Sequence, residues 1–349
     1  MEFMKGIAVM APGVVEVRYD IPVPEIGDYE ALLRVHACGF CNVTDMEILS
    51  GQGGLEGGAE NMYPTVLGHE GAGEVIAIGK KVRNIKVGER WIHPNLRRNV
   101  GNGYHKAHGG MAEYGMVCDT QAMLEDGYVP AEPPWYRQHR FPETIDYIDA
   151  GVLLSLSESH SAAVNFGIGN GSKVLIYGAG PMGIALAMFS VLRGAHVTQV
   201  DRVGERLAIA KEVAGVQRTI NSSEQSVSEV LGDEKFDVAC DVVGLTEVIY
   251  EAGQYVRQGG LIGGMGVLRA HDRLVDVSRL PNNVSFHPLN FPYGEYDIMD
   301  ETIAMIEDGR IDPKKFYSHV LPFTKIHEAM ELVRTKKALK VILDFDREA

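Results

Sequence analysis

Residues 173–201, KVLIYGAGPMGIALAMFSVLRGAHVTQVD, decide the fold of this chain. An apolar run ends at Tyr177, a glycine-rich turn follows, a helical pattern covers 184–192, and a second apolar run ends at Asp201. Strand, G-x-G-x-x-G turn, helix and strand in this order, with an acidic residue at the end, make up the full context of a dinucleotide-binding turn. The stretch therefore predicts a parallel sheet with a cofactor site at its edge.

Each glycine of the turn is required for a steric reason. Gly178 permits the tight turn, Gly180 lets the backbone approach a pyrophosphate, and Gly183 lets the helix pack closely on the strand. Pro181 and Met182 complete the turn at the start of the helix, where phosphates bind. These five residues are the predicted pyrophosphate-binding segment.

Asp201 predicts the choice of dinucleotide. A carboxylate at the end of the second strand accepts hydrogen bonds from a ribose diol and repels a 2′-phosphate, which favours NAD over NADP. Arg202 complicates this preference and joins the predicted cofactor site, because a neighbouring cation can tolerate a 2′-phosphate.

Composition narrows the remaining possibilities. A chain of 349 residues favours two domains. The net charge of −14 argues against nucleic acids and anionic membranes as partners. There is no uninterrupted apolar run of about 18 residues, and MEFMKGIAVM lacks a signal-peptide layout, so we expect a cytoplasmic protein. Four scattered cysteines are not a disulfide framework.

Two kinds of pattern divide the chain. Residues 1–150 hold short, closely spaced strand patterns, which predict a β-rich, barrel-like domain. Residues 151–290 alternate strand and helix patterns, which predict an α/β, doubly wound parallel sheet. The last strand pattern, 340–345, is expected to pair back onto the first domain, so that 291–349 complete it. Residues 121–149 are rich in proline and aromatic residues, and we interpret them as an irregular insertion that could cover a cleft.

Two segments of the first domain carry metal-binding side-chain types. Cys38–Asp45 is CGFCNVTD, and Gly68–Glu74 is GHEGAGE. A lone cysteine or histidine is usually structural. A cysteine-containing loop upstream of adjacent histidine and glutamate, however, provides all the donor types that a catalytic zinc requires.

These segments resemble one known family. LGHEGAGEVIAIGKKVRNIKVGER (67–90) looks like the zinc signature of the medium-chain dehydrogenase/reductase superfamily, in particular its zinc-dependent alcohol and polyol (sorbitol-like) dehydrogenases. GFCNVTD (39–45) looks like their zinc-cysteine motif, and GGMAEY (109–114) matches a further family segment. The resemblance covers essentially the whole chain, and it implies a GroES-like catalytic domain followed by a Rossmann domain.

The resemblance implies roles for single residues. Cys41 and His69 would be zinc ligands, with Glu70 beside the metal or bound to it. Thr44 matches the hydroxyl residue that passes the substrate proton toward solvent. Asp45 matches the carboxylate that orients the ligand histidine.

One basic position also carries over. Lys340, in KALKVILDF, matches a family residue that approaches the cofactor phosphates or the metal-side glutamate.

The chain departs from the family pattern in three places. Thr44 lies three residues after Cys41 rather than two, so either the loop has one extra residue or Asn42 takes the ligand position; we favour Cys41, because thiolate is the better zinc ligand. Residues 94–108 contain no cysteine, so the structural zinc lobe is absent and one zinc per chain is expected. The fourth position of the metal is left to water, Ser155 or Glu158, and Glu158 is equally explained as an ordinary polar residue on a helix.

The resulting hypothesis is an enzyme that uses NAD and one catalytic Zn²⁺ to oxidise a secondary alcohol, with a polyol or sugar-type substrate implied by the resemblance. Simple alcohols or amino alcohols are the first alternative. A zinc-free quinone or enone reductase and a non-catalytic NAD-binding protein are the others. Fold-level analogy further implies a homo-oligomer, dimer or tetramer.

Overall fold

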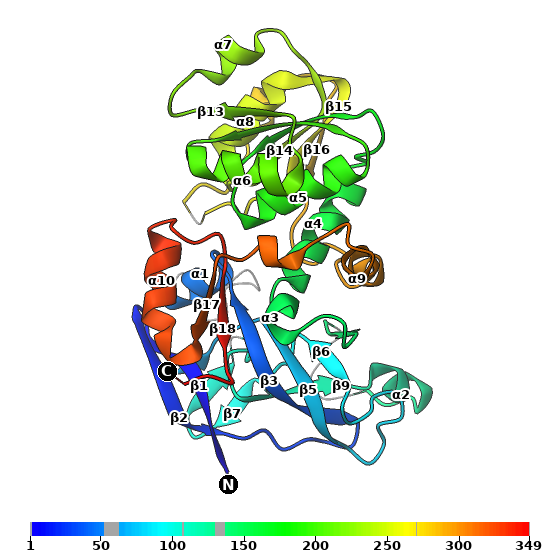
Figure 1. The fold of residues 1–349 in the computed structure, drawn as a ribbon, viewed down its shortest axis with the longest axis vertical. Coiled ribbons are helices and arrows are strands. Elements are labelled where there is room, and N and C mark those ends of the chain that lie inside the picture. Colours follow the sequence, from blue (N-terminus) through cyan, green and yellow to red (C-terminus); the bar gives the residue numbers. More distant parts are fainter. Residues whose placement is uncertain (1, 52–62, 107, 130–136, 270, 349) are drawn as a thin grey trace. The chain divides into compact units, whose positions relative to one another are not determined.

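The chain divides into two compact units. The structure is a computed structural model that describes residues 2–51, 63–106, 108–129, 137–269 and 271–348 (Figure 1). One unit comprises 1–154 with 299–349, and the other comprises 155–298.

The first unit contains two sheets. The smaller has the strand order β2-β1-β4-β8-β7. Its strands are β1 (Phe3–Ala11), β2 (Val14–Pro22), β4 (Thr65–Val66), β7 (Asn99–Gly101) and β8 (Tyr104–Lys106). Together with the larger sheet it forms the β-rich unit that the sequence predicts.

The larger sheet supports the metal-binding segments. Its order is β10-β6-β5-β3-β18-β17, and β9 also pairs with β3. The strands are β3 (Glu30–Phe40), β5 (Glu70–Ile78), β6 (Arg90–Ile92), β9 (Tyr114–Cys118), β10 (His139–Phe141), β17 (His319–Pro322) and β18 (Val341–Asp344). Strand β18 pairs antiparallel with β3, so the C-terminal strand lies beside an N-terminal one (Figure 1).

Short helices cover this unit. They are α1 (Thr44–Ser50), α2 (Thr120–Glu125), α3 (Tyr147–Ala150), α9 (Met299–Glu307) and α10 (Ile326–Arg334). Helix α10 buries Ile326, Ala329 and Val333, whose spacing places them on one face. That face joins the same buried cluster as Phe323 and Phe345, whose rings stack 5.0 Å apart.

The insertion is more ordered than the sequence indicated. Residues 121–149 contribute to α2, β10 and α3, and β10 extends the larger sheet by pairing with β6. The sequence did not predict these elements, because the segment is rich in proline and has no clear period. Strand β10 in addition depends on β6, which is remote in sequence. The stretch 130–136 lies outside the described residues.

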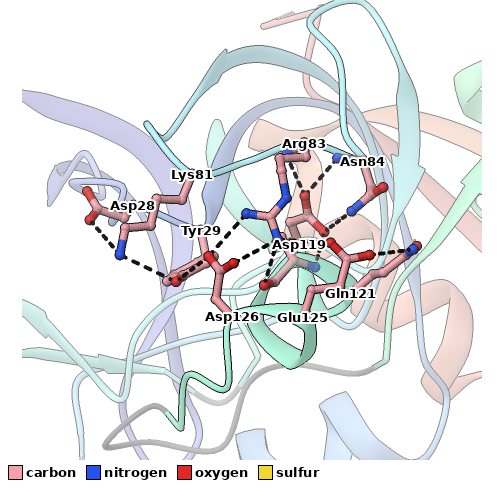
Figure 2. Close-up of polar contacts among 10 residues, drawn as sticks. Asp28, Tyr29, Lys81, Arg83, Asn84, Asp119, Gln121, Glu125 and Asp126 are labelled. Carbon is pink, nitrogen blue, oxygen red and sulfur yellow. Dashed lines mark hydrogen bonds and ion pairs between the residues drawn. The ribbon is translucent and has the colours of Figure 1, made fainter.

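A polar network attaches α2 to the turn after β5 (Figure 2). Asp119 caps the helix by accepting from Ala122 N, and it also accepts from the backbone N–H groups of Arg83 and Asn84. Arg83 forms ion pairs with Glu125 and Asp126. The start of the insertion is therefore fixed by a buried cap and by exposed ion pairs.

The second unit is a six-stranded parallel sheet of order β13-β12-β11-β14-β15-β16. This order is that of a doubly wound Rossmann fold, and it confirms the predicted class. Its strands are β11 (Lys173–Tyr177), β12 (His196–Asp201), β13 (Arg218–Asn221), β14 (Phe236–Asp241), β15 (Val256–Gly264) and β16 (Ser285–Pro288).

Helices lie on both faces of this sheet. They are α5 (Pro181–Leu192), α6 (Gly204–Ala214), α7 (Val227–Leu231) and α8 (Thr246–Tyr255), and α4 (Leu153–Asn165) precedes the first strand. Helices α5 and α6 lie on one face and α8 on the other (Figure 1). Coverage of both faces explains why the central strands are continuous apolar runs. Among the described residues, no helix is both long enough and apolar enough to cross a membrane.

Candidate metal centre and cofactor site

The three donors implied by the resemblance lie together. Ligand atoms of Cys41, His69 and Glu70 are all within 4.8 Å of one another. His69 Nε2 is 3.8 Å from Glu70 Oε1. Ligands around a tetrahedral zinc are about 3.5 Å apart, as bond lengths of 2.0–2.3 Å require. One thiolate, one imidazole and one carboxylate therefore fit a zinc ion with a position left open, which is the pattern of a catalytic site.

The larger sheet brings these side chains together. Strand β3 lies between β5 and β18, and in register Gly39 faces Glu70 on one side and Ile342 on the other. Glu70 forms an ion pair with Lys340, which lies two residues before Ile342 in sequence, and both side chains are buried. A Cβ at Gly39 would lie 2.4 Å from Glu70 Oε2 and 3.0 Å from Lys340 Cε. Only glycine at this position leaves room for the pair.

Lys340 is thus placed at one of its two predicted positions. It lies against the metal-side glutamate, within the first unit. Its predicted contact with the cofactor phosphates stays a prediction.

The loop before α1 explains the irregular spacing. Asn42 and Val43 form a turn between Cys41 and the helix, which takes up the extra residue. Asp45 is fully buried; its Oδ2 accepts from Cys41 N at 2.9 Å, and its Oδ1 lies 3.7 Å from His69 Nδ1. Asp45 therefore lies on the side of the imidazole opposite the other donors, where a carboxylate orients a ligand histidine. Thr44 is the first residue of α1 and is partly buried.

Cys41 and His69 shift the pKa values of each other. Burial alone would raise the pKa of the Cys41 thiol, but the hydrogen bond and charge of His69 lower it below the usual value. Burial lowers the pKa of His69, but Cys41 and the carboxylates of Asp45 and Glu70 outweigh this and raise it to about 10. A lowered thiol pKa favours the thiolate, which is the form of cysteine that binds zinc.

Two further histidines, which sequence reasoning missed, surround His69. The ring centroids of His108 and His93 lie 5.1 Å and 6.5 Å from that of His69, and 6.0 Å from each other. Backbone bonds attach both to the segment that carries His69: His93 N donates to Gly71 O, and His108 N donates to Val66 O. His93 also has a φ of 59°, unusual for a residue other than glycine.

Both additional imidazoles are neutral at physiological pH. Burial is the main cause, and the charge of His69 adds to it: the pKa of His93 falls to about 3, and the pKa of His108 falls well below its usual value. In the sequence, His93 is marked only by its position after a strand pattern, and His108 only by its position before GGMAEY.

The proposed sources of a fourth ligand lie in the other unit. Ser155 and Glu158 are on α4, and Ser155 is buried. Their role at the metal stays a prediction.

The glycine-rich turn has the geometry expected of a pyrophosphate site. Gly178 has a φ of 108°, and helix α5 starts at Pro181 and Met182 with Gly180 as its N-cap. A Cβ at Gly183 would lie 2.1 Å from Gly178 O, so no other residue fits there. The N-terminus of α5 therefore carries free backbone N–H groups on a turn that side chains do not obstruct.

Asp201 ends β12, with Arg202 directly after it. The carboxylate also accepts hydrogen bonds from Ala179 N and Val203 N. A carboxylate offers about four lone-pair directions, so two remain for a ribose diol. The sequence did not indicate this backbone role.

Comparison with known proteins agrees with both parts of the site. Residues 27–127 match the alcohol dehydrogenase GroES-like domain, and residues 181–305 match the zinc-binding dehydrogenase family. Sorbitol dehydrogenase of Bombyx mori is 28% identical over 97% of this chain and 98% of its own length. L-threonine 3-dehydrogenase of Yersinia pestis (strain Pestoides F) is 26% identical over 94% and 95%.

A solved structure, that of alcohol dehydrogenase TADH from Thermus sp. ATN1, shares the fold with a TM-score of 0.79 at 23% identity, covering 98% of this chain and 99% of that one. Similarity thus extends over both units, and the three donors that a zinc-free reductase would not need lie together in the first. The chain belongs to the medium-chain dehydrogenase/reductase superfamily, among its NAD-dependent, zinc-containing alcohol and polyol dehydrogenases.

Proposed function

We propose that this enzyme oxidises a secondary alcohol of a polyol or sugar-type substrate, and that Cys41, His69 and Glu70 hold its one zinc ion. The observation that carries the proposal is the convergence of these three donors, whose ligand atoms lie within 4.8 Å of one another where β3 ends and β5 begins. We further propose that residues 1–154 with 299–349 act as the catalytic unit and that 155–298 bind NAD.

The side chains divide the work. When bound, zinc supplies Lewis acidity that lowers the pKa of an alcohol, and NAD supplies the hydride acceptor. Asp45 orients His69, and Lys340 compensates the charge of Glu70. Thr44, at the start of α1, takes the proton that leaves the substrate hydroxyl and passes it toward solvent.

Polar groups around the cluster support a polyol. Asn42 Oδ1 is buried and has no hydrogen-bond partner among the described residues, and it belongs to the residue next to Cys41. The neutral imidazole of His108 has one N–H donor and one acceptor. A substrate with hydroxyl groups beside the reacting carbon could satisfy such groups, whereas an apolar alcohol could not. Whole-length similarity to sorbitol dehydrogenases points the same way.

An amino-alcohol substrate is the second candidate. Similarity to an L-threonine 3-dehydrogenase favours it. The positive charges of Arg137 and Lys106, which help to lower the pKa of His93, also favour it, because they could attract a substrate carboxylate.

A substrate panel separates these candidates. We would measure kcat/KM with NAD for sorbitol, xylitol, ribitol, L-threonine and 2-butanol on protein of known zinc content. We expect one of the polyols to exceed 2-butanol by at least about tenfold, the value of one good hydrogen bond to the substrate. A preference for 2-butanol or L-threonine would contradict the polyol assignment, and absence of turnover with every alcohol by zinc-loaded protein would contradict the proposed reaction. The homo-oligomeric state also stays a proposal, which light scattering tests.

A further inference from the structure

One peptide group of the glycine-rich turn is held at both ends by side chains of β12. Gln199 Nε2 donates to Gly178 O at 2.8 Å, and Ala179 N donates to Asp201 Oδ2 at 2.6 Å. Gly178 N donates to the backbone oxygen of Val200, also at 2.8 Å. Gln199 and Asp201 therefore hold the peptide group between Gly178 and Ala179, and Val200 holds the peptide group that precedes it.

Strand geometry makes this arrangement possible. Residues 199 and 201 are two apart on a strand and so project from the same face of the sheet. Val200 is in register with Tyr177, the last residue of β11, which places both side chains beside the start of the turn. Asp201 is fixed further by Val203 N, which donates to its Oδ1 at 2.8 Å.

The held carbonyl is also the group against which α5 packs. A Cβ at Gly183 would lie 2.1 Å from Gly178 O and 3.4 Å from Gln199 Nε2. The carbonyl is thus enclosed by the amide on one side and the start of the helix on the other. Its direction determines how the following N–H groups present themselves to a pyrophosphate.

Gln199 is a costly residue to place here for stability alone. The residue is fully buried, and its Oε1 has no hydrogen-bond partner among the residues described. An unpartnered buried oxygen offsets much of what the bond to Gly178 contributes. An apolar side chain of similar length would avoid that penalty.

We propose that Gln199 is a positioning residue for the dinucleotide, acting through the carbonyl of Gly178, and that Asp201 shares this task by holding Ala179. This backbone contact of Asp201 is separable from the effect of its charge on the choice between NAD and NADP, which the sequence already predicts. The proposal rests on NAD binding by this unit and not on the identity of the alcohol.

Three variants test it in the full-length enzyme. Gln199→Met keeps the length of the side chain and removes both the donor and the unpartnered oxygen. Asp201→Asn keeps an acceptor for Ala179 N and removes the charge. Thr198→Val is the matched control, because residue 198 is buried on the same strand and projects from the opposite face.

Dissociation constants for NADH and NADPH, from fluorescence titration, are the readout, together with the Tm of the cofactor-free protein. For Gln199→Met we expect both constants to rise by the same factor, about fivefold, as the loss of one hydrogen bond implies. The Tm should fall by no more than about 2 °C, because the unpartnered Oε1 is removed together with the donor and only the loss of a partner for Gly178 O remains as a cost. Asp201→Asn should instead change the NADH-to-NADPH ratio, and Thr198→Val should change neither constant.

Two results would overturn the positioning role. One is a Gln199→Met protein that binds both cofactors as the parent does. The other is weakened binding that comes only with a fall of several degrees in Tm. If Asp201→Asn left the ratio unchanged, the separate role of its charge would be wrong. A failure of the polyol proposal would move none of these readouts.

Discussion

Cys41 and Asn42 compete for the metal by sequence spacing, and we favour Cys41 on the chemistry of its side chain. The Cys41 ligand atom lies within 4.8 Å of those of His69 and Glu70. Thiolate is also the better zinc ligand. Asn42 Oδ1 instead remains as a buried acceptor beside the cluster.

Substitutions at this loop should separate metal binding from proton transfer. We expect Cys41→Ser and His69→Ala to lose zinc, because each removes one of three donors, and Asn42→Ala to keep it. Thr44→Ala should also keep zinc while kcat falls by roughly 10²–10⁴, the value of a proton-transfer group. Elemental analysis and steady-state kinetics are the measurements.

Cys118→Ser is the matched control for that series, because Cys118 is a buried thiol outside the donor group. Zinc lost from Asn42→Ala but kept by Cys41→Ser would reverse the ligand assignment, and with it the placement of Thr44.

At the scale of the element, the sequence predicted those helices and strands that a continuous local stretch determines, and it missed those that depend on remote partners. The turn at Gly178–Gly183 is determined by a continuous stretch, and its strand, helix and sheet order were predictable. Strands β4, β7 and β8 have two or three residues each, too few for a period, and they exist because of remote partners.

The same distinction applies to the metal centre. Its donors could be predicted by resemblance, since each lies in a recognisable motif. His93 and His108 could not, because the pairing of β5 with β6 and the backbone bonds of the segment before β9 bring them to His69. Neither arrangement leaves a spacing in the sequence.

Asp119 tests the attachment of the insertion. Asp119→Ala removes the cap of α2 and leaves the N–H groups of Arg83 and Asn84 without their acceptor. We expect the free energy of unfolding at pH 7 to fall by about 2–4 kcal/mol, the sum of a cap and of bonds to a charged group. Glu125→Ala, which breaks an exposed ion pair with Arg83 and an exposed hydrogen bond from Gln121, should cost less than about 1 kcal/mol.

The stability that Asp119 contributes should depend on pH, and the sign of that dependence follows from the pKa of its carboxyl group. Burial would raise the pKa of Asp119, but the N–H groups of Asn84, Arg83 and Ala122 outweigh it and lower the pKa below its usual value. A lowered folded-state pKa adds stability above the unfolded-state pKa and loses it as pH falls through the folded value. The difference between parent and Asp119→Ala in denaturant unfolding should therefore shrink below about pH 4. A difference that grew in acid would contradict this account.

At the scale of the whole molecule, the proposed zinc site and the proposed NAD site lie in different units. Cys41, His69, Glu70 and Lys340 all lie in the unit formed by 1–154 and 299–349, and the turn at Gly178 lies in 155–298. Each unit has its own buried apolar cluster. Loss of one ligand should therefore leave the other site formed.

Removal of zinc tests that separation directly. We expect a chelator such as dipicolinate to abolish turnover, because the Lewis acid is lost. The dissociation constant of NADH should change by less than about twofold, equivalent to roughly 0.4 kcal/mol, because the glycine-rich turn is held by β12 and not by the metal centre. Gln199→Met is the complementary case, and it should keep zinc while binding NADH weakly. Added zinc should restore turnover to the chelated protein. The contrary outcome is chelated protein that keeps its circular-dichroism spectrum but no longer binds NADH. That result would show that NADH binding depends on the metal centre, and the two sites could then not be treated as independent.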